Sequence, residues 1–104
     1  MSDADWRLTI SAHALADLAA LYDHIAAEDP AAAERLLDQM IAKMDWMPKA
    51  KFRGVSRDWI SPGLRALPFK GRCIYFRLVG TEIRVIRVLH GRQDISQPLF
   101  PNDD

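Results

Sequence analysis

The sequence has a single cysteine and no long apolar run. Because Cys73 stands alone among 104 residues, a disulfide within the chain is excluded, and no cysteine–histidine cluster has the spacing of a metal site. No apolar stretch approaches the roughly 20 residues that a membrane-spanning helix needs. Residues 1–5 are acidic and lack the basic and apolar regions of a signal peptide. We therefore expect a cytoplasmic protein with no metal, no cofactor and no membrane contact.

The chain has no net charge, but its charges are unevenly distributed. Residues 1–48 contain three basic and nine acidic side chains, a balance of −6, and residues 49–104 contain eleven basic and five acidic ones, a balance of +6. Such segregation lets a neutral protein present a basic face to an acidic partner. A solvated acidic helical surface beside an arginine-rich sheet edge would give the same count, so both interpretations stay open.

Hydrophobic periodicity predicts a short strand followed by a helix. Residues 6–10 alternate apolar and polar side chains, which is typical of a strand with one buried face. Ser11 is placed to cap a helix over residues 12–28. Spacings of three and four residues put several large side chains on one face of this helix. The predicted buried face consists of Leu15, Leu18, Tyr22 and Ile25.

A second amphipathic helix follows after a very short connection, which predicts an antiparallel helical hairpin. Asp29 can accept a hydrogen bond from a first-turn amide, and Pro30 suits the first helical position, where no amide hydrogen is needed. Pro48 is the expected end of the helix. The predicted core stripe consists of Ala33, Leu36, Leu37, Met40, Ile41, Met44 and Met47, with Trp46 beside it.

The second half of the chain predicts a loop followed by three strands. Residues 49–63 show little periodicity, and Phe52 and Trp59 are expected to anchor this long loop to the core. Cys73 is expected to be an inert strand residue, because no neighbouring motif suggests a low thiol pKa. Strands are predicted at 64–69, 72–79 and 82–90, with a tight turn at 80–81 and an extended tail over 94–104.

The order β-α-α-β-β-β predicts the fold class. Helices that are amphipathic on one face must cover a sheet, so we expect a two-layer α+β domain. In this arrangement the α-helical hairpin packs on a mainly antiparallel sheet. The length of the chain fits a single domain over residues 1–104.

Several short segments, in this order and spacing, carry a resemblance to a known family. They are 8–11 (LTIS) with Ala14 and 17–18 (DL), then 28–33 (EDPAAA), 62–68 (PGLRALP), 74–77 (IYFR) and 85–94 (VIRVLHGRQD). Each segment alone is common, but together they are specific. Through them the chain resembles the ParE branch of the RelE/ParE toxin superfamily over nearly its whole length. Ala12 departs from the proline often found there, which affects only the start of the helix.

This resemblance implies the toxin component of a type II toxin–antitoxin system, of the kind that serves plasmid maintenance. Such a toxin arrests growth by binding and inhibiting DNA gyrase. The resemblance also implies a ParD-like antitoxin that combines a DNA-binding dimerisation domain with a segment that wraps the toxin, in a hetero-oligomer. The toxin would then meet DNA only through the antitoxin. We expect the helical hairpin and a sheet edge to leave apolar surface for the wrapping segment.

The candidate binding residues are charged side chains on and just after the predicted strands. One hypothesis makes them a reader of an acidic surface on the target or the antitoxin. The alternatives are that His90 fixes a turn, that Arg92 pairs with Asp94, and that the strand arginines lie in solvent over apolar neighbours. Glu82 and Arg84 could form a weak local pair. The candidate set is Arg65, Arg77, Arg84, Arg87, His90, Arg92 and Asp94.

The RelE-like branch of the superfamily offers a second hypothesis, ribosome-dependent cleavage of messenger RNA. This reaction needs an acid, a base and cations for the phosphate charge. The candidates would be His90 as acid or base, Arg65, Arg77 and Arg92 as phosphate clamps, and Tyr75 for stacking or proton donation. Residues 93–104 contain no lysine, arginine, histidine or tyrosine, which favours gyrase binding over RNA cleavage and a chain without enzymatic activity. A third hypothesis is a non-toxic member that only binds its antitoxin.

Overall fold

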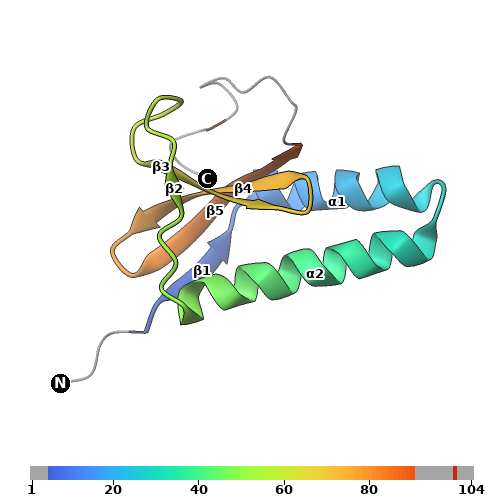
Figure 1. Cartoon of the computed structure of the whole chain (residues 1–104), viewed down its shortest axis with the longest axis horizontal. Helices are drawn as coiled ribbons and strands as arrows, with labels where there is room; N and C mark the ends of the chain where they lie inside the picture. Colours follow the sequence, from blue (N-terminus) through green and yellow to red (C-terminus); the bar gives the residue numbers. More distant parts are fainter. Residues whose placement is uncertain (1–4, 91–99, 101–104) are drawn as a thin grey trace.

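The computed structural model describes residues 5–90 and Phe100 (Figure 1). Its elements are β1 (Arg7–Ile10), α1 (Ala12–Ala26), α2 (Pro30–Lys49), β2 (Val55–Ser56), β3 (Leu64–Phe69), β4 (Arg72–Val79) and β5 (Glu82–His90). The two helices run antiparallel as one layer against the sheet, and their far ends project beyond it (Figure 1). The predicted α+β fold class is confirmed, and the sequence did not reveal β2, which lies inside the predicted loop.

The sheet is mixed and brings the first strand of the chain beside the last. Its order is β1-β5-β4-β3-β2, with β1 parallel to β5 and every other pair antiparallel. One irregularity interrupts the central pair: Phe76 pairs with Val85 and Tyr75 pairs with Arg87, so Ile86 has no partner in β4. This bulge changes the direction of the β5 side chains beyond it.

Ser11 joins the start of α1 to that bulge. Its hydroxyl accepts a hydrogen bond from the backbone N–H of Ala14 at 3.0 Å, which confirms the predicted helix cap. The same hydroxyl donates to the carbonyl oxygen of Ile86 at 2.8 Å. Because Ser11 is buried, its hydroxyl cannot reach water, and these two hydrogen bonds satisfy it instead. The helix therefore starts at a place that the sheet determines.

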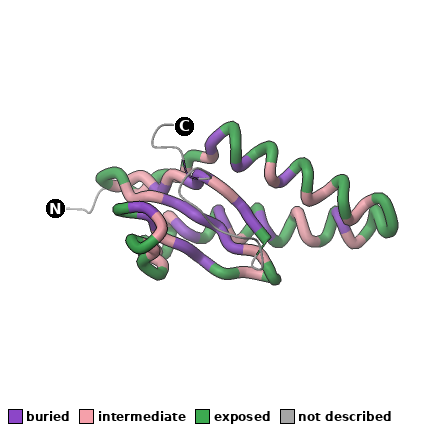
Figure 2. Tube along the Cα trace, turned by 90° about the horizontal axis from the view of Figure 1, so that it is seen from above, coloured by how far each residue is buried: buried purple, intermediate pink, exposed green. Residues whose placement is uncertain are grey.

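The core between the layers contains the predicted methionine stripe. Met40, Met44 and Met47 are fully buried, and they pack with apolar residues of β3, β4 and β5. Figure 2 shows buried residues along the central strands and on one side of each helix. Other members of the predicted stripes are exposed, because the apolar surface of the hairpin is wider than the sheet face that covers it. These exceptions are Leu15 at 55%, Ile41 at 43% and Trp46 at 41% exposure.

The segment between α2 and β3 is anchored differently from the sequence-based expectation. Phe52 packs on the core and contacts the ring of Phe76, as predicted, with centroids 6.2 Å apart. Trp59 does not anchor the loop, since 76% of its side chain is exposed. Pro48 does not end α2 either, because the helix extends to Lys49 and the N–H of Ala50 still donates to the Trp46 carbonyl at 3.0 Å.

Gly54 allows this segment to run tightly against the sheet. Its φ is +68°, which disfavours any residue with a Cβ atom. A Cβ atom added there would lie 2.7 Å from the carbonyl oxygen of Ala66 and 2.7 Å from Cζ of Phe76. Only glycine therefore fits beside β3 without displacing the backbone or a core ring.

A second apolar cluster covers the sheet face opposite the helices. It contains Leu64, Ala66, Cys73, Tyr75, Ile86, Leu89 and Phe100, with Ile60 at its border. The rings of Tyr75 and Phe100 meet edge to face, with centroids 4.7 Å apart. Apolar residues therefore occupy both faces of β4 and β5, as expected for central strands.

The charge split in the sequence follows the two layers. Residues 12–49, which form the helical layer, contain seven acidic and three basic side chains. Residues 50–90, which form β2 to β5 and their connections, contain nine basic and two acidic ones. The molecule thus has an acidic helical layer beside a basic sheet. Among the described residues, no helix is long and apolar enough to cross a membrane.

Candidate binding site

The structure does not bring the predicted arginines together on one surface. Arg87 points to the helical layer, where its guanidinium binds both carboxylate oxygens of Asp17 in α1 at 2.8 and 2.9 Å. The same carboxylate accepts a hydrogen bond from the N–H of Val88 at 2.9 Å. Only 17% of the Arg87 side chain and 14% of the Asp17 side chain are exposed. This pair links α1 to β5. From the sequence, Asp17 was named only as part of a family motif, not as a site residue.

Arg77 and Arg65 hold loops in place. The guanidinium of Arg77 donates to the carbonyl oxygen of Pro62 at 2.7 Å and to the hydroxyl of Ser61 at 2.9 Å. Arg65 donates from Nε to the carbonyl oxygen of Arg53. Each side chain therefore satisfies backbone groups of the segment that precedes β3.

Arg84 and Glu82 form the local pair that their spacing predicted. Nη2 of Arg84 lies 3.1 Å from Oε1 of Glu82. The hydroxyl of Thr9 in β1 also donates to Glu82, at 2.6 Å. The hydrogen bond from Thr9, together with the contact to Arg84, holds the pKa of Glu82 below its ordinary value. The pair thus contributes to the junction of β1 and β5.

Tyr75 is buried in the cluster on the outer sheet face. Burial, with a further contribution from the adjacent Cys73, raises the pKa of Tyr75 to about 12. Its hydroxyl is therefore protonated at neutral pH and can donate a hydrogen bond, but it is unsuited to act as a base. Phe100 contacts the ring at a centroid distance of 4.7 Å. These contacts do not favour stacking of a nucleotide base on Tyr75.

The ionisation of Tyr75 is a direct test of this environment. The difference in tyrosinate absorbance between the wild type and Tyr75→Phe is expected to have its midpoint near pH 12, above the ordinary value of 10.0. Because the folded pKa is the higher one, the stability that Tyr75 contributes is complete below pH 10. It decreases between pH 10 and 12, where only the unfolded chain ionises. A midpoint near 10 would show that Tyr75 is open to solvent.

His90 lies exposed at the end of β5, opposite Arg72 of β4. The structure therefore places it at the margin of the sheet, away from Arg65 and Arg77. Arg92 and Asp94, the remaining predicted site residues, lie outside the described residues. The predicted set is thus distributed over several surfaces, and four of its arginines have structural partners.

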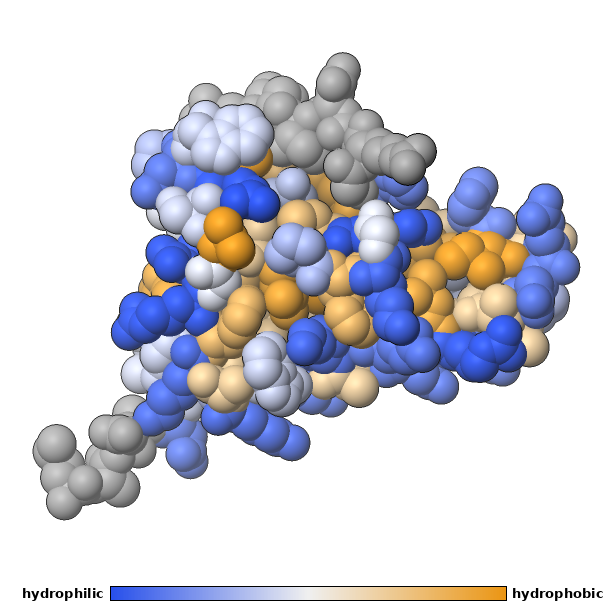
Figure 3. Space-filling model, in the orientation of Figure 1, coloured by the Kyte–Doolittle hydropathy of each residue, from blue (hydrophilic) through white to orange (hydrophobic). Residues whose placement is uncertain are grey.

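The helical hairpin carries an apolar groove. It has a volume of about 440 Å³ and is lined by Leu15, Leu18, Ala19, Tyr22, Asp23, Leu37 and Ile41. Leu15 and Ile41 are the two most exposed of its large apolar side chains. Figure 3 shows apolar side chains gathering over the hairpin on the viewed face. Exposed apolar surface of this kind is typical of protein-binding sites.

A helical hairpin on a mixed sheet, with an apolar groove between the helices, defines a small α+β domain suited to binding other proteins. The family model for the ParE toxin of the type II toxin–antitoxin system parDE matches residues 8–95. The chain therefore belongs to the ParE toxin family, as its sequence motifs indicated.

The structural comparison agrees with the family assignment. A chain from the structure of the chromosomal ParDE TA system from P. aeruginosa superposes with a TM-score of 0.73 and 26% sequence identity. The match covers 83% of this chain and 96% of that chain. A comparison with curated proteins gives no significant match. Family and fold are thus established by two independent comparisons.

Proposed function

We propose that this chain is a toxin that inhibits DNA gyrase by binding it in the cytoplasm, and that a ParD-like antitoxin neutralises it. The observation that carries the proposal is the family match over residues 8–95, which includes both helices and four complete strands. The basic sheet and the acidic helical layer support two separate binding surfaces on one molecule.

The arrangement of the candidate catalytic residues favours a binder over an RNA-cleaving enzyme. Cleavage requires an acid, a base and cations around one phosphate. Within residues 5–90 and Phe100, Arg65 and Arg77 bind carbonyl oxygens of neighbouring loops. Tyr75 is buried against Phe100. The fold itself occupies these three side chains, so the described members of the predicted catalytic set do not gather around His90.

The groove on the hairpin supports the antitoxin part of the proposal. Its lining is apolar apart from Asp23, and the surrounding helices are acidic. An amphipathic antitoxin helix with basic flanks would bury its apolar face there and pair its cations with the helical layer. The antitoxin would cover Leu15 and Ile41 and leave the basic sheet to be reached from another side.

A gyrase assay with the purified chain tests this function. We expect the toxin to block supercoiling or to trap cleaved DNA, and an equimolar amount of its antitoxin to restore gyrase activity. Messenger RNA from arrested cells is expected to remain intact. If a preparation that still arrests growth leaves gyrase activity normal at high toxin excess, the proposal is contradicted. Codon-position-specific cuts in messenger RNA would point to RNA cleavage instead. Expression without growth arrest would identify a non-toxic member that only binds its antitoxin.

A further inference from the structure

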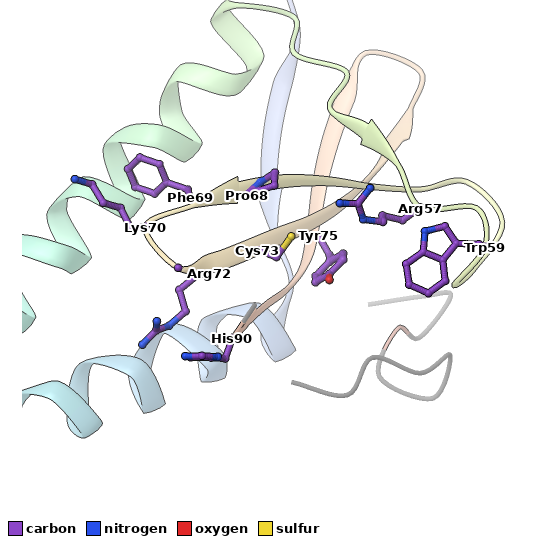
Figure 4. Close-up of a pocket in the computed structure, with 10 residues that line it drawn as sticks. Arg57, Trp59, Pro68, Phe69, Lys70, Arg72, Cys73, Tyr75 and His90 are labelled. Carbon is purple, nitrogen blue, oxygen red and sulfur yellow. The ribbon is translucent and has the colours of Figure 1, made fainter. Parts of the chain in front are cut away.

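A second concave surface lies over β3 and β4, between the loop before β3 and the β3–β4 turn. It has a volume of about 860 Å³, within the range of ligand sites. Figure 4 shows Arg57 and Trp59 at one end, Cys73 and Tyr75 in the middle, and Arg72 beside His90 further along. Lys70 in the β3–β4 turn also lines it. The pocket shares no residue with the hairpin groove.

The charged side chains among the described residues of this pocket are all basic. Arg57, Lys70 and Arg72 come from separate parts of the fold, and all three line it. None of the described residues that line it is acidic. Cations collected around a concave surface without a carboxylate raise the local concentration of anions. The pocket therefore favours an anionic ligand with more than one charge.

Trp59 adds a second, apolar feature to the same pocket. Its side chain is 76% exposed, although a tryptophan ring gains several kcal/mol from burial elsewhere in proteins. The loop around it is well fixed: Asp58 accepts a hydrogen bond from the N–H of Gly63 at 2.8 Å, and the N–H of Arg57 donates to the Leu64 carbonyl at 2.8 Å. A structured loop thus holds the indole in solvent next to a guanidinium.

We propose that this pocket binds single-stranded nucleic acid, with Trp59 stacked on an unpaired base and Arg57, Lys70 and Arg72 in contact with phosphates. Aromatic stacking combined with a line of cations is the usual means of holding single strands without sequence preference. A duplex offers phosphates but not a free base face, so it is the weaker ligand. The proposal does not depend on gyrase being the target. The strand could come from DNA or from RNA, because both have the same phosphates and stacking faces.

The test measures fluorescence anisotropy of short labelled oligodeoxythymidylate, oligouridylate and duplex DNA with the purified full-length chain. Single strands are expected to bind more tightly than the duplex. Three phosphate contacts predict that Kd rises about 20-fold between roughly 50 and 200 mM salt. Trp59→Ala is expected to weaken single-strand binding by at least about fivefold. Arg57→Ala is expected to weaken binding and to lower the salt dependence by about one phosphate contact.

Two variants serve as matched controls. Trp46→Ala removes a partly exposed tryptophan of α2 that does not line the pocket, and Arg35→Ala removes an exposed arginine of the same helix. Both are expected to bind single strands like the wild type. Preference for uridylate would assign the site to RNA, and preference for deoxythymidylate would assign it to DNA. Absence of binding at low salt, or equal losses in Trp59→Ala and Trp46→Ala, would overturn the proposal, whatever the gyrase assay shows.

Discussion

Replacing both Leu15 and Ile41 with glutamate is expected to weaken antitoxin binding about a thousandfold and to leave the fold intact. Leu15 and Ile41 line the groove from α1 and α2, and both are exposed, so the substitutions disturb little of the core. Loss of a side chain at the centre of an interface typically costs about 2 kcal/mol or more of binding free energy. Two such losses amount to about 4 kcal/mol, which corresponds to a thousandfold change in Kd.

The measurement is a titration of antitoxin into each variant, with growth of cells that express both proteins as a second readout. Cells with the double variant are expected to arrest although the antitoxin is present, because the target surface is unchanged. Val79→Glu is the matched control, since Val79 is 45% exposed and lies outside the groove. If the double variant is neutralised like the wild type, the antitoxin does not use this groove.

Asp17→Ala is expected to lower the free energy of unfolding by about 3 kcal/mol. The alanine leaves the guanidinium of Arg87 and the N–H of Val88 without their carboxylate, in a region where Arg87 is only 17% exposed. Removing the carboxylate costs more than the pair contributes, because it no longer compensates the desolvation of the half-enclosed guanidinium. The total free energy of unfolding of a small domain is about 5–15 kcal/mol, so this loss is a large fraction of its stability.

Urea denaturation of the variants measures this effect. Asp23→Ala is the control, because Asp23 is an exposed acid of the same helix and its loss is expected to change stability by less than about 0.5 kcal/mol. In Asp17→Ala/Arg87→Met the guanidinium is removed together with its carboxylate, so part of the lost stability is expected to return. A loss in Asp17→Ala no greater than in Asp23→Ala would mean that the link between α1 and β5 has no energetic role.

Much of the fold was predictable because its signals are local. Ser11 and Asp29 cap their helices through residues three positions away, as their types and positions indicated. The methionine stripe is buried because its spacing matches the helical repeat. The two-residue strand β2 carries too little pattern to be recognised, and it exists only because Val55 and Ser56 pair with β3.

The site was less predictable, because the role of a charged side chain depends on what lies opposite. Arg77 and Arg87 occur in similar strand contexts, yet one binds a loop carbonyl and the other a helix carboxylate. Trp59 was expected to be an anchor because tryptophan is usually buried, and its exposure became visible only once the loop geometry was known. Its association with Lys70 and Arg72 joins positions that no local pattern connects.

The sequence by itself determined the helices, the three long strands, the segregation of charge and the family, since these depend on local periodicity, caps and a specific order of motifs. The tertiary structure decided that β1 lies parallel to β5, that Asp17 meets Arg87, and which apolar side chains remain uncovered. Periodicity defines which face of a helix or strand is apolar. Which neighbour covers this face, and how much of the face it covers, are decided only when segments distant in the chain pack together.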